Sequence, residues 1–185
     1  KQLTLSSLRL DLAKRTIMKT RPSSFLLLGL AMVLYTAGCT TPKLAQQKRV
    51  VYGERNKQEL TYEFLKPKKN NGLGIVVMVS GSWRSDPKDF KPKMGRAFLR
   101  RGYSMFAVSH LSQPKATIPE IYEDVTRAVQ HIRKHADDYG IDPKQLGVIG
   151  ASAGGHLSLM VATRGKEFSG NQEGLVRAVA IFFPV

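Results

Sequence analysis

The sequence is poor in cysteine, in acidic residues and in long apolar runs. Cys39 is the only cysteine in 185 residues, so no disulfide can form within the chain and its folded part must be stabilised by packing. No apolar run approaches the ~20 residues needed to span a bilayer as a helix. The phosphate-binding patterns G-x-G-x-x-G and G-x-x-x-x-G-K-S/T are also absent, which argues against a nucleotide-binding fold.

Acidic residues number 14 against 29 lysines and arginines, which gives a net charge of +15. Residues 1–49 hold nine of these cations and a single acid, Asp11. The densest cluster in the rest of the chain lies at 84–101, without an aromatic stacking platform or a nucleic-acid motif. We interpret it as a solvated basic face and predict no nucleic-acid partner. An anionic envelope surface or an acidic polysaccharide is the alternative partner.

Residues 18–38 have the layout of an export signal. Lys19 and Arg21 form a short basic region, 25–34 is a ten-residue apolar region, and small residues stand at 37 and 38. The alternative is a buried helix, which the uncharged sequence directly behind two cations disfavours. We predict a signal peptide that starts at Met18.

The sequence around Cys39 resembles bacterial lipoprotein precursors, in which a Leu-Ala-Gly-Cys box is cleaved before a cysteine that then carries lipid. Residues 36–39 read TAGC and match this box at the last three positions. The resemblance implies lipidation of Cys39 and a protein exported to the bacterial cell envelope and anchored to a membrane. Residues 1–17 are then an upstream, non-native start, and the polar residues 39–49 a tether.

Residues 50–185 show alternating strand and helix patterns. Strands are predicted where β-branched and apolar residues run together or alternate, at 50–52, 60–65, 74–79, 103–108, 146–149 and 176–183. Helices are predicted at 90–101, 119–139 and 153–163. The run at 74–79 indicates a strand buried on both faces. The run at 176–183 indicates a final buried strand of the fold, which we expect to be a bare apolar edge in this chain. This alternation predicts an α/β fold with crossover helices.

Residues 150–154 read GASAG and match G-x-S-x-G. The motif joins a predicted strand to a predicted helix, where a sharp turn exposes the serine and the glycines leave room for the neighbouring backbone. The helix N-terminus also favours negative charge that develops in a transition state. We predict Ser152 as a nucleophile. The alternative is a glycine-rich strand-to-helix turn of the nucleotide-binding kind.

The loop at 79–83, VSGSW, follows the predicted strand 74–79. Esterases with this elbow place backbone N–H groups here to bind an oxyanion, usually on His-Gly-Gly-Gly-Trp. Aligned on Trp83, this loop has serines in place of two of the glycines. We predict Gly81, Ser82 and Ala153 as the amide donors. An ordinary polar loop is the alternative.

Together with AVSH at 107–110, QP at 113–114 and IDP at 141–143, these two elements make the chain resemble the α/β-hydrolase superfamily. The resemblance is greatest to its bifunctional feruloyl and acetyl-xylan esterase-like branch, with prolyl-oligopeptidase-type hydrolases nearby. It covers 50–185 and implies a mostly parallel sheet with flanking helices, ester hydrolysis through an acyl-enzyme at Ser152, and no metal or organic cofactor.

The acid and base of the expected triad have no counterpart after Ser152. In this superfamily they follow the serine in the order Asp or Glu, then His. The chain offers Glu167, Glu173 and His156, and none fits its role. We therefore expect a partial domain that lacks its last strands and is inactive as this chain, because a serine without its base retains little activity.

Three further histidines and the tryptophan have structural alternatives. His131 and His135 have i, i+4 spacing but stand beside cations without a glutamate, so we predict a solvated helix face and no metal. His110, at the carboxyl end of its strand, is predicted as a site-rim residue rather than a substitute base. Trp83 is predicted either to line the substrate site or to pack.

The sequence thus predicts a serine hydrolase of carboxylic esters. Its substrate is a small-molecule or polysaccharide ester, and acetyl or feruloyl groups are implied by resemblance alone. Two alternatives remain: a prolyl-oligopeptidase-like peptidase, and a non-catalytic envelope protein that retains the fold.

Overall fold

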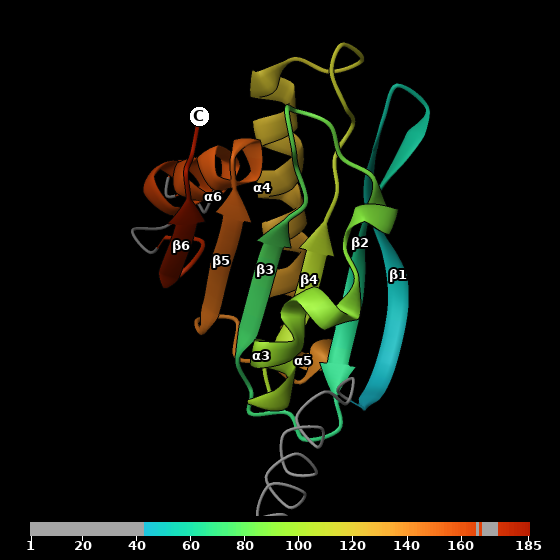
Figure 1. Cartoon of the computed structure of the whole chain (residues 1–185), viewed down its shortest axis with the longest axis vertical. Coiled ribbons are helices and arrows are strands. Elements are labelled where there is room, and N and C mark those ends of the chain that lie inside the picture. Colours follow the sequence, from blue (N-terminus) through green and yellow to red (C-terminus); the bar gives the residue numbers. More distant parts are fainter. Residues whose placement is uncertain (1–42, 166, 168–173) are drawn as a thin grey trace, which may run out of the picture. The chain divides into compact units, whose positions relative to one another are not determined.

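The computed structural model describes residues 43–165, 167 and 174–185. Its described strands form a six-stranded sheet in the order β1-β2-β4-β3-β5-β6 (Figure 1). Strands β4, β3, β5 and β6 run parallel, whereas β1 and β2 are antiparallel at one edge. The strand bounds are β1 Leu44–Arg55, β2 Gln58–Pro67, β3 Gly74–Met78, β4 Ser104–Val108, β5 Leu146–Ala151 and β6 Ala178–Phe182. This mixed sheet with flanking helices confirms the predicted α/β fold class.

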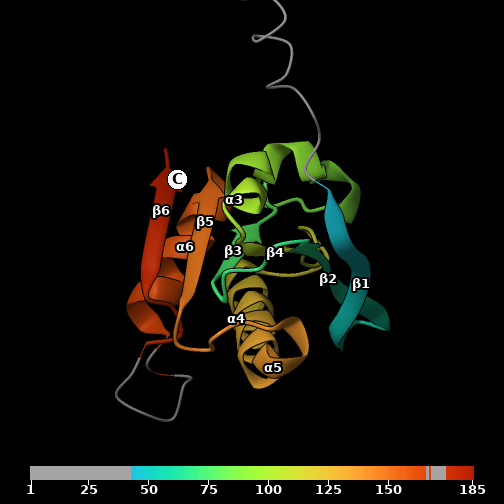
Figure 2. The same ribbon diagram turned by 90° about the horizontal axis from the view of Figure 1, so that it is seen from below.

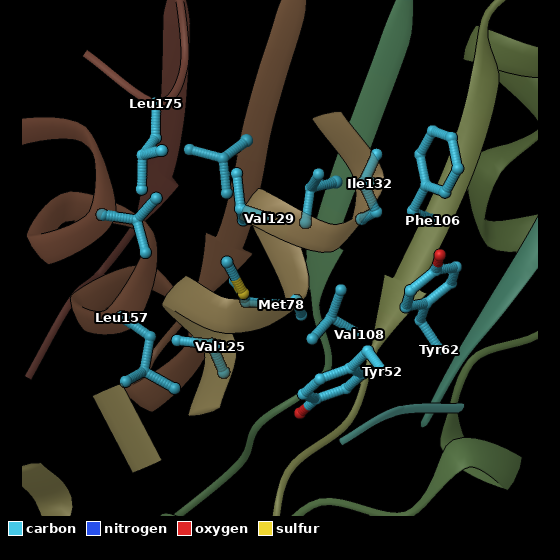
Figure 3. Close-up of a cluster of buried hydrophobic side chains, with 14 of the residues drawn as sticks. Tyr52, Tyr62, Met78, Phe106, Val108, Val125, Val129, Ile132, Leu157 and Leu175 are labelled. Carbon is cyan, nitrogen blue, oxygen red and sulfur yellow. The ribbon is translucent and has the colours of Figure 1, made fainter. Parts of the chain in front are cut away.

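Helix α4 (Ile118–Lys134) begins at a capping box. The Thr117 hydroxyl accepts from the Glu120 N–H, while the Glu120 carboxylate accepts from the Thr117 N–H at 2.7 Å, and proline at 119 follows the cap. Val125, Val129 and Ile132 recur at helical spacing and are fully buried against the sheet (Figure 3). The periodicity that predicted this helix therefore reflects its packing face.

The sheet is covered by different elements on its two faces. Helix α4 and helix α6 (Ala153–Arg164) share one hydrophobic cluster with the sheet, which includes Phe106, Val148 and Leu157. Helix α3 (Arg96–Arg100) lies on the opposite face, where Phe90 and Leu99 form a second cluster with β2 and β4 (Figure 2). The layers hold the carboxyl ends of the parallel strands in register at one edge.

The first strand begins earlier than predicted. Leu44 to Arg49 belong to β1 and pair with β2, so they are not the tether that we predicted over 39–49. Residues 45–49 are exposed at the sheet edge. A strand at an edge needs no alternation of apolar and polar residues, so the polar sequence did not predict it. The predicted signal peptide, the lipidation site Cys39 and residues 1–42 as a whole lie outside the described residues.

Two helix predictions need correction. The expected helix at 90–101 is a 3₁₀ turn η2 (Pro92–Gly95) followed by the short α3, with a further 3₁₀ turn η1 (Pro87–Asp89) before it. Prolines that open both turns supply no N–H for a continuous helical ladder. The expected helix at 119–139 is divided into α4 and α5 (Ala136–Tyr139), and α5 ends at Gly140 with φ of 66°.

Strand β6 is the edge strand of the described sheet, which agrees with the bare apolar edge that we expected for this chain. Val179 and Phe182 are 42% and 52% exposed. Its α6 side is covered, but no described element covers the other side. The continuous apolar run therefore identified a strand of the parallel sheet, although the strand is not buried within the described residues. None of the helices in 43–165 and 174–185 has the length and hydropathy needed to cross a bilayer.

Candidate active site

Ser152 stands at the junction of β5 and α6, with φ of 52° and ψ of −127°. A residue with a Cβ rarely adopts a positive φ, and such strain persists where surrounding structure enforces it. The Ser152 N–H donates to the Phe182 carbonyl at 3.0 Å, and the Ser152 carbonyl accepts from the His156 N–H at 3.0 Å. The turn is therefore fixed from β6 on one side and from the first turn of α6 on the other.

The two glycines of the motif are required by close backbone contacts. A Cβ at Gly150 would lie 2.1 Å from the Gly154 carbonyl oxygen, and one at Gly154 would lie 2.5 Å from the Met78 carbonyl oxygen. Both distances are far below van der Waals contact, and the obstructing atoms are backbone. The spacing G-x-S-x-G thus has a direct steric origin here: α6 begins against β5 and β3 too closely for any side chain at either position.

The loop after β3 contains a tight turn at 81–84. The N–H of Gly81 donates to the Arg84 carbonyl at 2.9 Å, and the N–H of Arg84 donates back to the Gly81 carbonyl at 2.9 Å. Ser82 and Trp83 between them have φ of 49° and 59°, which is the backbone of a type I′ turn. Two consecutive non-glycine residues with positive φ mark a second strained segment beside the first.

The turn at 81–84 and the turn at Ser152 are joined directly. The Gly154 N–H donates to the Ser80 carbonyl at 3.1 Å, so the loop that carries Ser82 is bound to the start of α6. Ala153, as the first residue of that helix, has no intrahelical acceptor for its N–H. Among the predicted oxyanion donors, Gly81 must be set aside in this conformation, because its N–H is engaged by Arg84. Ser82 and Ala153 remain the candidates.

His110 follows β4, which lies two strands from β5, the strand that leads to Ser152, since β4 and β5 flank β3. It is buried, because its ring lies beneath the loop after β3, and its place on the rim of a substrate site stays a prediction. Its Nδ1 is 2.9 Å from the Leu111 carbonyl and its Nε2 is 2.8 Å from the Ser80 hydroxyl. Burial lowers the pKa of His110, which favours the neutral imidazole.

His156 and Trp83 contact each other. Their rings meet edge to face with centroids 5.5 Å apart, and the His156 Nδ1 lies 2.6 Å from the Val185 carbonyl. Trp83 also packs against the main hydrophobic cluster, so the structure assigns it packing contacts. Glu167 forms an ion pair with Arg164 at 3.0 Å, and Glu173 lies outside the described residues. In 43–165 and 174–185, no side chain is hydrogen-bonded to the Ser152 hydroxyl.

Of the two histidines predicted on a solvated helix face, His135 is 39% exposed, whereas His131 packs against β2. Their rings stack with centroids 4.4 Å apart, and the His131 Nδ1 is 3.0 Å from the Tyr62 hydroxyl. His135 pairs instead with Asp138 at 3.1 Å. Burial, reinforced by the neighbouring His135 and Lys134, lowers the pKa of His131. His131 therefore makes a polar contact between α4 and β2.

An apolar cavity of about 310 Å³ opens on the α3 face of the sheet. It extends from the carboxyl ends of β3 and β5 to α3, η2 and β6. Its walls include Val79, Met94, Phe98, Ala151 and Phe182. The cavity lies on the sheet face opposite α6, where β5 and β6 have no described helix over them.

Serine contacts that the sequence did not reveal surround the turn. The Ser85 N–H donates to the Ser112 hydroxyl at 2.9 Å, and the Ser85 hydroxyl donates to the Val79 carbonyl. The Gln113 N–H donates to the Trp83 carbonyl at 3.1 Å. A local motif could not have identified these residues, since they meet across β3 and β4.

A serine at a glycine-flanked strand-to-helix turn, on a mostly parallel sheet with helices on both faces, defines an α/β-hydrolase of the esterase type. The particular family follows from the sequence: residues 63–180 match the BD-FAE family model, and the chain belongs to that family.

Relatives and solved structures agree with this class. A probable isoprenylcysteine alpha-carbonyl methylesterase of Oryza sativa subsp. japonica is 28% identical over 60% of this chain and 26% of its own length. A probable carboxylic ester hydrolase, LipM of Mycobacterium tuberculosis, is 38% identical over 48% of this chain and 21% of its own length. Thermogutta terrifontis esterase 2, in its paraoxon-phosphorylated structure, has a TM-score of 0.65 at 22% identity and covers 78% of this chain and 59% of its own. The chain thus spans about a quarter to a third of the first curated relatives.

Proposed function

We propose that Ser152 is the nucleophile of a carboxylesterase. The observation that carries this proposal is the backbone of Ser152, held at positive φ between two glycines whose neighbours leave no room for a Cβ. Such a turn costs folding free energy of order 1–3 kcal/mol, and strained residues of this kind cluster at active sites. Here the turn presents a hydroxyl for attack. Family membership supports ester hydrolysis at the level of the class.

In the proposed reaction, the Ser152 oxygen attacks the ester carbonyl carbon and transfers its proton to a base. The N–H groups of Ser82 and Ala153 stabilise the oxyanion of the tetrahedral intermediate. The alcohol leaves with that proton, and water then releases the acid from the acyl-enzyme. In 43–165, 167 and 174–185 no side chain is hydrogen-bonded to the Ser152 hydroxyl, and Glu167 is paired with Arg164, so we assign neither the acid nor the base to these residues.

The substrate class in this proposal is an acetyl or feruloyl ester, carried by a polysaccharide or a small molecule. Family membership supports it, as does similarity to an endo-1,4-beta-xylanase B of Butyrivibrio fibrisolvens, which is 40% identical over 32% of this chain and 10% of its own length. A prolyl-oligopeptidase-like peptidase and a non-catalytic envelope protein are the competing functions.

The first test is to sequence the gene beyond the codon for Val185, and then to treat the complete gene product with paraoxon. Because Thermogutta terrifontis esterase 2 is phosphorylated by paraoxon, we expect one diethylphosphoryl group on Ser152 by peptide mass spectrometry. Ser152→Ala should remove it while the thermal midpoint is retained. Acetyl and feruloyl esters should be hydrolysed, and a peptide anilide should not.

The competing functions give different results. A folded gene product that neither reacts with paraoxon nor hydrolyses any ester would support a non-catalytic protein. Preferential cleavage of the anilide would support a peptidase. A downstream reading frame that supplies an Asp and then a His would agree with the proposed triad, whereas an immediate stop codon would contradict it.

We also propose that residues 18–38 are a signal peptide and that Cys39 carries a lipid that anchors the domain to a bacterial envelope membrane. The support is the TAGC box and the basic and apolar regions that precede it. Cys39→Ser should abolish labelling by a palmitate analogue and release the protein from the membrane fraction. Unchanged processing and partition would contradict the anchor.

A further inference from the structure

We propose that His110 is a positioning residue that holds the oxyanion turn through the hydroxyl of Ser80. This inference rests on the proposed function, because it assigns a role within the same site. The buried imidazole and the 2.8 Å contact to Ser80 carry it. His110 belongs to the segment after β4, whereas Ser80 belongs to the loop after β3.

The hydrogen bonds of His110 define its tautomer. The Leu111 carbonyl can only accept, so the His110 Nδ1, at 2.9 Å, carries a proton and donates. In the neutral ring Nε2 is then unprotonated and accepts from the Ser80 hydroxyl. Burial lowers the pKa of His110 and so keeps it in this neutral form. Both ring nitrogens are therefore used structurally, and neither is available as a base.

Ser80 transmits this contact to the site. Its carbonyl accepts from the Gly154 N–H, two residues after Ser152. Its side chain is fixed by His110, and the next residue, Gly81, opens the turn that carries Ser82. Ser80 thus connects His110, the nucleophile elbow and the oxyanion turn. A shift of Ser80 would move the Ser82 amide relative to Ser152.

The turn needs this external support because it contains little glycine. Ser82 and Trp83 are held at positive φ, which residues with a Cβ rarely adopt unless the surrounding structure enforces it. The segment after β4 supplies further bonds to the turn: the His110 N–H donates to the Ser85 hydroxyl at 3.3 Å, and the Gln113 N–H donates to the Trp83 carbonyl at 3.1 Å. His110 is the member of this set whose side chain reaches Ser80.

The predicted signature is a loss of kcat with an unchanged KM. Oxyanion stabilisation acts in the transition state, and removal of a direct donor lowers kcat by about 10²–10³-fold. An indirect displacement should cost less, about tenfold. We expect this loss from Ser80→Ala and from His110→Phe, with KM changed less than twofold. His110→Gln, which offers an acceptor oxygen near the Nε2 position, should restore most of the rate.

The experiment measures steady-state hydrolysis of an acetyl ester by the complete gene product and these variants. The double variant Ser80→Ala/His110→Phe should lose no more activity than either single variant, because one contact is removed in all three. Tyr52→Phe is the matched control: it removes a buried bond from the Tyr52 hydroxyl to the Ser109 carbonyl at 2.7 Å, next to His110 but away from the turn. It should lower stability and leave kcat unchanged.

Each outcome has one interpretation. Additive losses, or an unchanged kcat in folded Ser80→Ala, would overturn the positioning role even if His110→Phe failed to fold. An equal kcat loss in Tyr52→Phe would indicate general destabilisation and would also overturn it. Wild-type protein that hydrolyses no ester would contradict the proposed function instead. In that case a nitrogen NMR spectrum would test the Ser80–His110 bond itself. The bond requires the tautomer of His110 that is protonated at Nδ1, so protonation at Nε2 would contradict it.

Discussion

Replacing Arg55 and replacing Asp124, the two partners of an ion pair, should lower the free energy of unfolding by different amounts. Asp124 is fully buried in α4, whereas the Arg55 side chain, from β1, is 16% exposed. The guanidinium bonds both carboxylate oxygens, at 2.7 Å and 3.0 Å. It also contacts Glu120 at 3.1 Å and Glu123 at 3.2 Å. These carboxylates raise the pKa of Arg55, with the Asp124 bond as the largest cause.

The size of each loss in stability depends on which charge remains buried in the variant. Among the cations of the described residues, Arg55→Met leaves Asp124 with Arg127 at 3.5 Å, so we expect a loss of about 3–5 kcal/mol in the free energy of unfolding. Asp124→Asn leaves Arg55 with its two glutamates, so we expect a smaller loss, of about 1–2 kcal/mol. Adding Asp124→Asn to Arg55→Met should raise stability, because a buried neutral amide costs less than a buried unpaired carboxylate.

The assay is urea unfolding of the complete gene product, followed by the fluorescence of Trp83, the sole tryptophan of residues 1–185. With a slope of about 2 kcal/mol/M, Arg55→Met should lower the midpoint by roughly 2 M. Arg49→Met is the control, since the Arg49–Glu63 pair is 55% exposed on the arginine side and should cost less than about 1 kcal/mol. A double variant less stable than Arg55→Met would refute the reasoning.

Two other predictions concern local geometry. Gly154→Ala would place a Cβ 2.5 Å from the Met78 carbonyl and should cost about 1–3 kcal/mol by thermal unfolding, whereas Gly81→Ala, with open space at its Cβ, should change stability by less than about 0.5 kcal/mol. Thr117→Ala should cost about 1 kcal/mol at neutral pH by removing the α4 cap. The Thr117 N–H and, after it, the Thr117 hydroxyl lower the pKa of Glu120. Thr117→Ala removes the hydroxyl bond and keeps the N–H bond, and the stability from the hydroxyl bond is present above the unfolded-state pKa and lost as pH falls through the folded value. The gap between wild type and Thr117→Ala should therefore narrow in acid, and a constant gap would contradict it.

The sequence predicted best those elements in which the spacing of apolar residues reflects packing in the core. Strand β3 and helix α4 are buried where their apolar spacing indicated, because periodicity and burial have the same cause. Strand β1 was predicted too short, since its first residues are polar and lie at an exposed edge. Sequence alone does not distinguish such an edge strand from a tether, because both leave their side chains in water.

The residues of the candidate site also differ in whether sequence alone could predict them. Ser152 was predicted from its flanking glycines, because the steric constraint acts between residues close in sequence. His110 and Ser80 are thirty residues apart and meet through the order of the strands. Strands β3 and β4 are parallel neighbours, so the loops at their carboxyl ends must be adjacent. Once that order is known, polar residues just after both strands become candidates for mutual contact. Ser80, which stands where the esterase loop has a glycine, then becomes a candidate for contact with the segment after β4, as its bond to His110 shows.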